Sequence, residues 1–237
     1  MVGSQPAPAG RRIVVVSPHL DDGVLSLGAA MAAWSRSGAT VELLTVLGCD
    51  PQSDAPAGGW DRRGGFRTEG DSARARREED SRACAVLGVT PVWLPFGSVD
   101  YERHGDEEDV RSAVGEALAD ADAALFPGFP LTHPDHEWLV LTLADGRFAC
   151  RRPGFYAEQP YAQRLARAPE LPAWVAEALG ERPSFGAIRA SLRDRFAKSR
   201  AIRRYRSQLP LLGMRRSVRR GPHILALHRE WVAWAAV

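Results

Sequence analysis

Strand-like and helix-like patterns alternate along the first two-thirds of the chain, and this alternation restricts the folds open to it more than any other feature. Apolar segments predicted as strands lie at 12–17, 40–47, 91–95 and 123–126. Strands separated by helices pair side by side in parallel, which gives a sheet covered on both faces. We therefore expect an α/β, Rossmann-like fold with a mostly parallel sheet flanked by helices on both faces.

The segments between these strands have the periodicity and end signals of helices. Helices are predicted at 25–37, 67–87, 107–119 and 134–145. Gly38 and Gly88 end the first two, and Pro134 occupies the first turn of the fourth. The Gly-, Pro- and Asp-rich segment 48–65 is predicted as a long irregular loop, and loops of that length are often functional.

The pattern loosens after residue 151, where prolines and scattered aromatic residues replace the alternation. We expect an irregular C-terminal elaboration, with irregular structure over the sheet edge at 152–186, a helix at about 185–209 and a mixed tail. Residues 1–10 are predicted as a disordered or extended N-terminus. Residues 11–237 are predicted as one domain, because 237 residues with 45% hydrophobic content suffice for a single core.

Composition and charge argue against several classes of protein. The 31 basic and 29 acidic residues give a formal charge of +2, so we expect no binding to nucleic acid. The small basic cluster at 215–220 is interpreted as a solvated loop rather than an anion-binding patch. The three cysteines lack metal-type spacing and are predicted as buried thiols, which favours a cytoplasmic location. No apolar run is long enough to predict a membrane span.

Two short segments rich in His and Asp follow predicted strands. Residues 17–22 read Ser-Pro-His-Leu-Asp-Asp, and residues 132–136 read Thr-His-Pro-Asp-His. In an open parallel sheet, binding sites form at the carboxyl ends of the strands. Imidazole and carboxylate groups are also ligands that zinc takes in proteins. Together the two segments therefore predict a catalytic metal site.

Each segment alone has a simpler interpretation. Asp21 and Asp22 precede a predicted helix, and aspartate is a preferred N-cap. His133 and His136 lie three residues apart in a polar turn, a spacing that is common without a metal. Both segments, however, end a strand and open a helix, so a parallel sheet can bring them side by side. This shared context favours a metal site over two independent caps.

The same residues resemble those of a known family. Residues 18–22 resemble the Pro-His-Pro-Asp-Asp signature of the LmbE-like, or PIG-L, zinc-dependent N-deacetylases, and residues 132–136 resemble its His-Pro-Asp-His signature. The resemblance continues in the helix pattern from Arg76 to Gly88, in Asp100 after the third strand and in the Lys-to-Gln stretch 198–208.

The resemblance spans roughly residues 12–210 and has two departures. Leu20 replaces the usual proline, at a position that shapes the turn and supplies no ligand. Gly23 stands where glutamate is typical, so any role of that carboxylate in the family does not transfer to this chain. Neither departure affects the ligands that the family implies.

The resemblance implies that His19, Asp22 and His136 bind one Zn²⁺ ion. Three protein ligands with open positions are also what a catalytic zinc requires, in contrast to a structural one. Such an ion lowers the pKa of water from about 16 toward 7, which makes water a nucleophile at neutral pH.

Three further residues are predicted to be catalytic. Asp21, next to a ligand, is predicted as the general base, unless it only caps the helix. His133 is predicted to stabilise the oxyanion that forms when water attacks an amide. Asp135 is predicted to hydrogen-bond His133 and keep it protonated, unless it only complements the helix dipole. Either Asp21 or His133 then protonates the leaving amine.

The resemblance also implies a substrate class. The expected enzyme removes an N-acyl group, most often N-acetyl, from an amino sugar or another sugar-containing small molecule. Arg76 and Asp100 are predicted to bind the substrate, and the loops 48–65 and 152–186 are expected to frame the pocket. The aromatic residues suited to stack on a sugar ring are Trp60, Phe129, Tyr156 and Tyr161.

Two alternative functions remain open. One is an amidase that cleaves a larger sugar–thiol conjugate, and the other is a binding module that kept the fold and lost the chemistry. The complete set of His and Asp residues argues against the second alternative. A homo-oligomer is compatible with the sequence.

Overall fold

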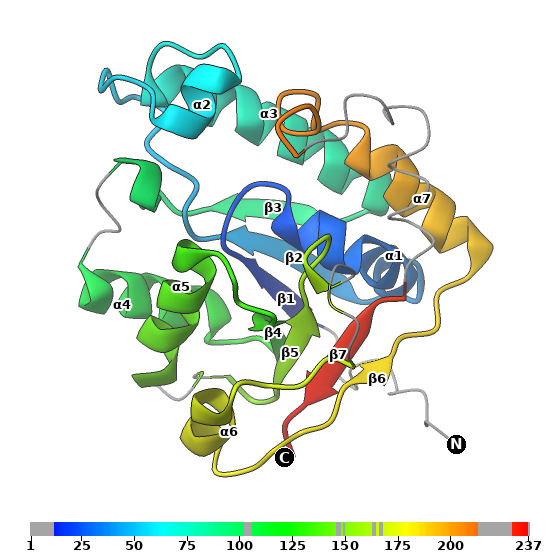
Figure 1. Ribbon diagram of the computed structural model, residues 1–237. Helices are drawn as coiled ribbons and strands as arrows, with labels where there is room; N and C mark the ends of the chain where they lie inside the picture. The colour runs from blue at the N-terminus through cyan, green and yellow to red at the C-terminus, as the bar shows by residue number, and fades with distance from the viewer. Residues whose placement is uncertain are drawn as a thin grey trace.

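The computed structural model describes residues 12–101, 106–145, 148, 150–162, 165, 168–212 and 229–236. The predicted N-terminal segment 1–10 and the basic cluster 215–220 lie outside the described residues. Within them, one sheet of seven strands has the order β3-β2-β1-β4-β5-β7-β6 (Figure 1). The strands are β1 (Arg12–Ser17), β2 (Thr40–Thr45), β3 (Thr90–Trp93), β4 (Ala123–Phe129), β5 (Pro153–Ala157), β6 (Gly186–Ala187) and β7 (Trp231–Trp234).

The sheet is mostly parallel. β1 pairs in parallel with β2 on one side and with β4 on the other. The β2–β3 and β4–β5 pairings are parallel as well, whereas β7 runs antiparallel between β5 and β6. The α/β fold class predicted from the alternation is confirmed.

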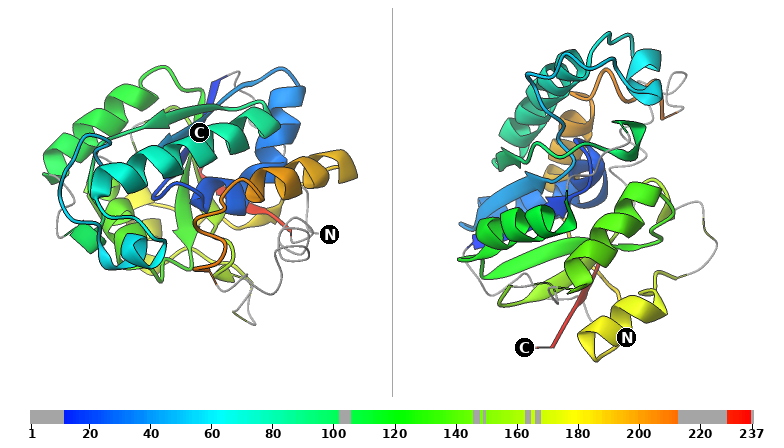
Figure 2. Two further views of the ribbon diagram at one scale, coloured as in Figure 1. Left: turned by 90° about the horizontal axis from the view of Figure 1, so that it is seen from above. Right: turned by 90° about the vertical axis from the view of Figure 1, so that its left-hand side faces the viewer.

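Helices cover both faces of this sheet. They are α1 (Asp22–Arg36), α2 (Gly59–Arg63), α3 (Glu69–Leu87), α4 (Glu107–Leu118), α5 (Pro134–Asp145), α6 (Ala173–Leu179) and α7 (Leu192–Ile202), with a 3-10 helix η1 (Val99–Tyr101). Figures 1 and 2 show α1, α3 and α7 on one face and α4, α5 and α6 on the other. Among the described residues, no helix has both the length and the apolar character that crossing a bilayer requires.

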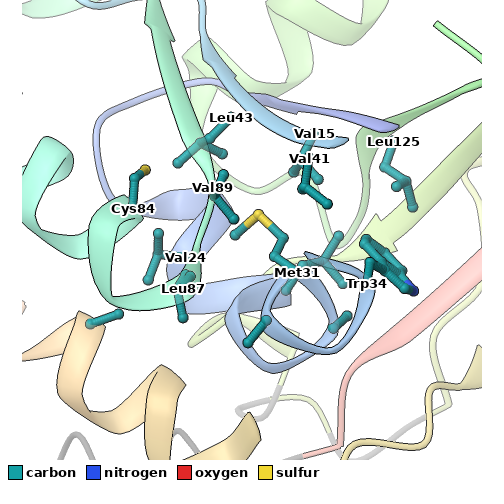
Figure 3. Close-up of a cluster of buried hydrophobic side chains, with 14 of the residues drawn as sticks. Val15, Val24, Met31, Trp34, Val41, Leu43, Cys84, Leu87, Val89 and Leu125 are labelled. Carbon is teal, nitrogen blue, oxygen red and sulfur yellow. The ribbon is translucent and has the colours of Figure 1, made fainter. Parts of the chain in front are cut away.

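Alternating side chains of the central strands form two cores. Val15 of β1 belongs to the buried cluster that also contains Met31 of α1 and Leu87 of α3 (Figure 3). Val14, its neighbour in β1, belongs to the opposite cluster with Leu139 of α5. Because successive residues of a strand point to opposite faces, a strand covered on both faces is apolar at every position. This explains the uninterrupted apolar run in β1.

The C-terminal third is more regular than predicted. The segment 152–186, expected to be irregular, contains β5 and α6, and β6 begins at its last residue, inside the region predicted as a helix. Pro153 and Gly154 open β5, and both residue types are depleted in strands, which concealed this strand in the sequence pattern. α7 is shorter than the helix predicted at 185–209, and the predicted loop 48–65 contains the short helix α2.

A buried ion pair connects α7 to an irregular turn in α1. α1 departs from helical geometry at Leu27, where φ is −124°. Glu230 accepts the backbone N–H groups of Ala29 and Ala30 just beyond this turn, at 2.9 and 2.7 Å. Lys198, on α7 and fully buried, donates from Nζ to Glu230 Oε1 at 2.6 Å. Each charge is therefore compensated inside the core.

Lys198→Met is expected to destabilise the protein by about 3 kcal/mol, because it leaves the buried Glu230 carboxylate without its partner. Urea unfolding of the variant measures this loss. The double variant K198M/E230Q should recover part of it, since the uncompensated charge is gone. Arg200→Met, at an exposed position of the same helix, serves as the control. A loss in K198M no larger than in the control would contradict this account.

Candidate metal centre

The two His- and Asp-rich segments meet at the centre of the sheet. β1 and β4 are neighbours, and the strand order continues through β2 on one side and β5 on the other. The loops that leave their carboxyl ends therefore face one crevice, which is the usual binding position in an open α/β sheet. One loop leads from Ser17 to α1, and the other leads from Phe129 to α5.

Local hydrogen bonds shape the first loop. Ser17 Oγ donates to the His19 carbonyl at 2.7 Å and accepts from the Gly23 N–H at 2.9 Å. Asp22 Oδ2 accepts from the His19 N–H at 3.0 Å. Asp21 occupies the N-cap position of α1, but its side chain makes no capping hydrogen bond to the helix. Its side chain lines the cavity described below.

The two departures from the family signature fit the packing of this chain. A Cβ at position 23 would collide with Leu43 Cδ1 and would lie 3.3 Å from Ser17 Oγ, so glycine suits this position. Leu43 is itself buried in the core beneath the loop. Leu20, at the usual proline position, is also buried. Both departures are therefore matched by local packing.

Three side-chain atoms converge at the crevice. Asp22 Oδ2 lies 3.2 Å from His19 Nδ1 and 3.1 Å from His136 Nε2, and the two nitrogens lie 3.3 Å apart. Two ligands of a tetrahedral zinc, each 2.0–2.1 Å from the ion, lie about 3.3 Å from one another. The spacing and the chemistry of these donors therefore fit a small divalent cation such as zinc.

Buried carboxylates contact the outer nitrogen of each ring. His19 Nε2 lies 2.7 Å from Asp135 Oδ2, and His136 Nδ1 contacts Glu158 Oε1. Asp135 Oδ1 also accepts from the backbone N–H of Val99 at 3.0 Å. Both imidazoles thus present their inner nitrogens to the same point. Carboxylates in this outer position orient metal-binding histidines and raise their basicity.

The predicted hydrogen bond between Asp135 and His133 is wrong. Asp135 Oδ2 lies 3.9 Å from His133 Nδ1, whereas it lies 2.7 Å from His19 Nε2. The first turn of α5 instead directs the Asp135 backbone N–H to His133 Nδ1 at 3.2 Å. Burial, with the neighbouring His19 and His136, lowers the pKa of His133 to about 4. The Asp135 carboxylate acts in the opposite direction, but it does not outweigh these effects on the pKa of His133.

His133 nevertheless lies at the site. Its ring centroid is 5.1 Å from that of His19 and 4.8 Å from that of His136. Each of the three histidines offers one nitrogen within 4.8 Å of the others, so His133 is a further candidate ligand beside His19, Asp22 and His136. Because its Nδ1 accepts a backbone N–H, a neutral His133 has its proton on Nε2.

The charged groups at the site shift one another's pKa. Burial disfavours the imidazolium of His136, but Asp22 and Glu158 outweigh burial and raise its pKa well above the usual value. Burial also disfavours the Asp22 carboxylate, yet His136 and His19 lower its pKa well below the usual range. Burial and the adjacent Asp22 raise the pKa of Asp21 to about 7. The cluster thus attracts positive charge at the point where the three donor atoms converge.

A cavity of about 280 Å³ opens beside these donors, near the lower end of the range for ligand sites. Its lining consists of His19, Asp21, Asp22, Leu25, Trp60, Asp61, Arg63, Arg76, Ser98, Val99, Asp100, His133, Asp135, Pro160, Tyr161, Gln208 and Leu212. Both residues predicted to bind substrate, Arg76 and Asp100, are in this lining. Trp60 and Tyr161 are as well, whereas Phe129 and Tyr156 are buried outside it.

Hydrogen bonds join the walls of this cavity. The backbone N–H of Trp60 donates to Asp100 Oδ2 at 2.8 Å, and its indole Nε1 donates to Gln208 Oε1 at 2.8 Å. Arg76 Nη1 lies 3.4 Å from Asp61 Oδ1. As expected, the loops 48–65 and 152–186 both contribute to the lining.

Two buried acidic residues of the site, Asp61 and Glu158, were not predicted from the sequence. Asp61 lay inside a segment predicted as irregular, and nothing in the sequence indicated that it would face Arg76. Glu158 follows β5, and the carboxyl end of that strand went unrecognised because the strand itself was not predicted. If β5 had been predicted as the fifth parallel strand, Glu158 would have been expected at its carboxyl end, where sites form in such sheets.

Known proteins resemble this chain in sequence and in fold. The chain is 32% identical over 175 residues to the 2'-N-acetylparomamine deacetylase of Streptomyces fradiae, a match that covers 64% of this chain and 58% of that protein. The A40926 pseudoaglycone deacetylase has a similar structure, with a TM-score of 0.74, 24% identity and coverage of 96% and 97% of the two chains. The zinc-inhibited form of a teicoplanin deacetylase gives a TM-score of 0.72 at 22% identity, with 94% and 97% covered.

At these identities the two solved structures establish the fold alone. The sequence itself matches the PIG-L family, described as GlcNAc-PI de-N-acetylase, over residues 14–144. This region contains both His- and Asp-rich segments of the metal centre and ends before Glu158. The resemblance drawn from the two signatures is therefore confirmed, and the chain belongs to the PIG-L family.

Proposed function

We propose that this protein is a zinc-dependent hydrolase that removes an N-acetyl group from an amino sugar or a sugar-containing small molecule. The observation that supports this most directly is the convergence of Asp22 Oδ2, His19 Nδ1 and His136 Nε2 within 3.3 Å of one another. Open space for a substrate lies directly beside them. When bound, zinc supplies a Lewis acid for the attacking water and for the amide carbonyl.

The cavity supports a small sugar substrate. Its volume of about 280 Å³ suits one sugar ring with a short acyl group better than a bulky sugar–thiol conjugate. Asp100 and Arg76 are the residues that we assign to the sugar hydroxyls, because both line the cavity outside the ligand cluster. The names of the relatives, a 2'-N-acetylparomamine deacetylase and a pseudoaglycone deacetylase, describe amide hydrolysis on sugar-containing molecules.

We assign catalytic roles to two further side chains at the site. Asp21 lines the cavity next to the ligand Asp22 and is the proposed general base, which takes a proton from water as the water oxygen attacks the amide carbon. His133 is proposed to donate from Nε2 to the oxyanion, since its Nδ1 is occupied by a backbone N–H. The carbon–nitrogen bond then breaks, and the proton from Asp21 passes to the leaving amine.

His19→Ala, Asp22→Ala and His136→Ala are each expected to lose bound zinc, because each removes one of three ligands. The metal content of the purified variants, measured by atomic emission, checks this. Asp100→Ala, which changes the cavity wall alone, is the matched control and should keep its zinc. Stoichiometric zinc in all three ligand variants would contradict the assignment.

Asp21→Asn is expected to keep its zinc and its fold but to lose about 10²- to 10⁴-fold in kcat, the usual contribution of a general base. Release of free amine from a panel of N-acetylated amino sugars measures the activity. A fully active D21N enzyme would remove Asp21 from the mechanism. A wild-type protein that deacetylates none of the panel would contradict the proposed function itself.

His133→Ala separates the two roles open to this residue. If His133 stabilises the oxyanion, the variant should keep its zinc and lose about 10²- to 10³-fold in kcat with little change in KM. Metal analysis and steady-state kinetics on the same preparation measure both quantities. Loss of zinc from H133A would instead make His133 a ligand.

A further inference from the structure

We infer that Glu158 is a positioning residue for the metal centre, which holds His136 in the tautomer and orientation needed to bind the ion. This inference rests on the proposed metal site. Glu158 lies outside the region that matches the family, on the segment that follows β5. Its side chain is 1% exposed and contacts a proposed ligand directly.

The contact determines which nitrogen of His136 is available. Glu158 Oε1 contacts His136 Nδ1, while His136 Nε2 lies 3.1 Å from Asp22 Oδ2 and 3.3 Å from His19 Nδ1. A carboxylate accepts hydrogen bonds, so the proton of a neutral His136 belongs on Nδ1. Nε2 then has its lone pair free and directed at the other two donor atoms.

Only a carboxylate satisfies all of the partners of Glu158. Its Oε2 accepts the backbone N–H of Leu131 at 2.8 Å, while Oε1 faces the N–H of His136. Both partners are donors, and an amide in place of the carboxylate would present its own N–H groups to one of them. In a buried site, two donors that face each other without an acceptor weaken the contact that orients the His136 ring.

The backbone around Glu158 is anchored to the segments that hold the ligands. The Glu158 N–H donates to the Phe129 carbonyl at the end of β4, at 2.6 Å. The next N–H, that of Gln159, donates to Ser26 Oγ on α1 at 3.0 Å. α1 contains Asp22, and the loop after β4 leads to His136. Glu158 therefore connects the two ligand-bearing segments and is itself held at a fixed position.

The decisive experiment compares Glu158→Gln with Glu230→Gln. Glu230 is 3% exposed and accepts two backbone N–H groups at 2.9 and 2.7 Å, but its contacts are with α1 and Lys198 rather than with a ligand. Both variants thus neutralise a buried carboxylate that is bonded to backbone. Zinc affinity of each apo-protein is measured by competition with a chelating dye, after folding is checked by circular dichroism.

Glu158→Gln is expected to bind zinc about 10- to 100-fold more weakly than the wild type, the usual effect of losing such an outer partner. E230Q should lose stability and keep its zinc affinity. Proton NMR gives a second readout, because a downfield imidazole N–H resonance of His136 should be present in wild type and E230Q and absent in E158Q. Should E158Q fail to fold, Glu158→Asp, which keeps the charge and shortens the reach, is measured in its place and should also bind more weakly.

The outcomes separate this inference from the proposed function. Zinc affinity unchanged in E158Q, or lowered equally in E158Q and E230Q, overturns the positioning role alone. A wild-type protein that binds no zinc overturns the proposed metal centre and the inference with it.

Discussion

The parallel pairing of β1 with β4 is the constraint on which the rest of the site depends. The register aligns Ile13 with Ala123 and Val15 with Leu125, and this alignment sets the loops after the two strands at one level. A strand advances about 3.3 Å per residue. A slip of one residue would therefore shift His19 relative to His136 by about the distance that now separates their donor nitrogens, which is 3.3 Å. The register in which β1 pairs with β4 therefore determines how the ligand residues are positioned relative to one another.

Buried carboxylates that satisfy more than one donor recur through this protein. Asp135 faces His19 and the Val99 N–H, and Glu158 faces His136 and the Leu131 N–H. Burying a carboxylate costs free energy unless its oxygens are matched by donors. In both cases one oxygen contacts a ring and the other binds backbone. The contacts that compensate these buried carboxylates therefore also orient the rings of the two ligands, His19 and His136.

The parts of the site that sequence could predict are those specified by local pattern. Around His19, a His- and Asp-rich turn connects a buried strand to the start of a helix, and the same pattern recurs around His136. Both segments could therefore be placed at one edge of the sheet. The partner of Asp135 could not be predicted, because the orientation of α5 against β1 decides which imidazole it faces. Glu158 could not be predicted either, since Pro153 and Gly154 conceal the strand before it.

The placement of β7 has a consequence for how the protein is made. β5, the strand that leads to Glu158, has β4 on one side and β7 on the other, and β7 comes from residues 231–234. During translation β5 is therefore an open edge, with unpaired backbone groups, until more than 70 further residues have been added. The half of the sheet that leads to Glu158 is therefore completed later in synthesis than the pairing of β1 with β4, which holds the two ligand-bearing loops together.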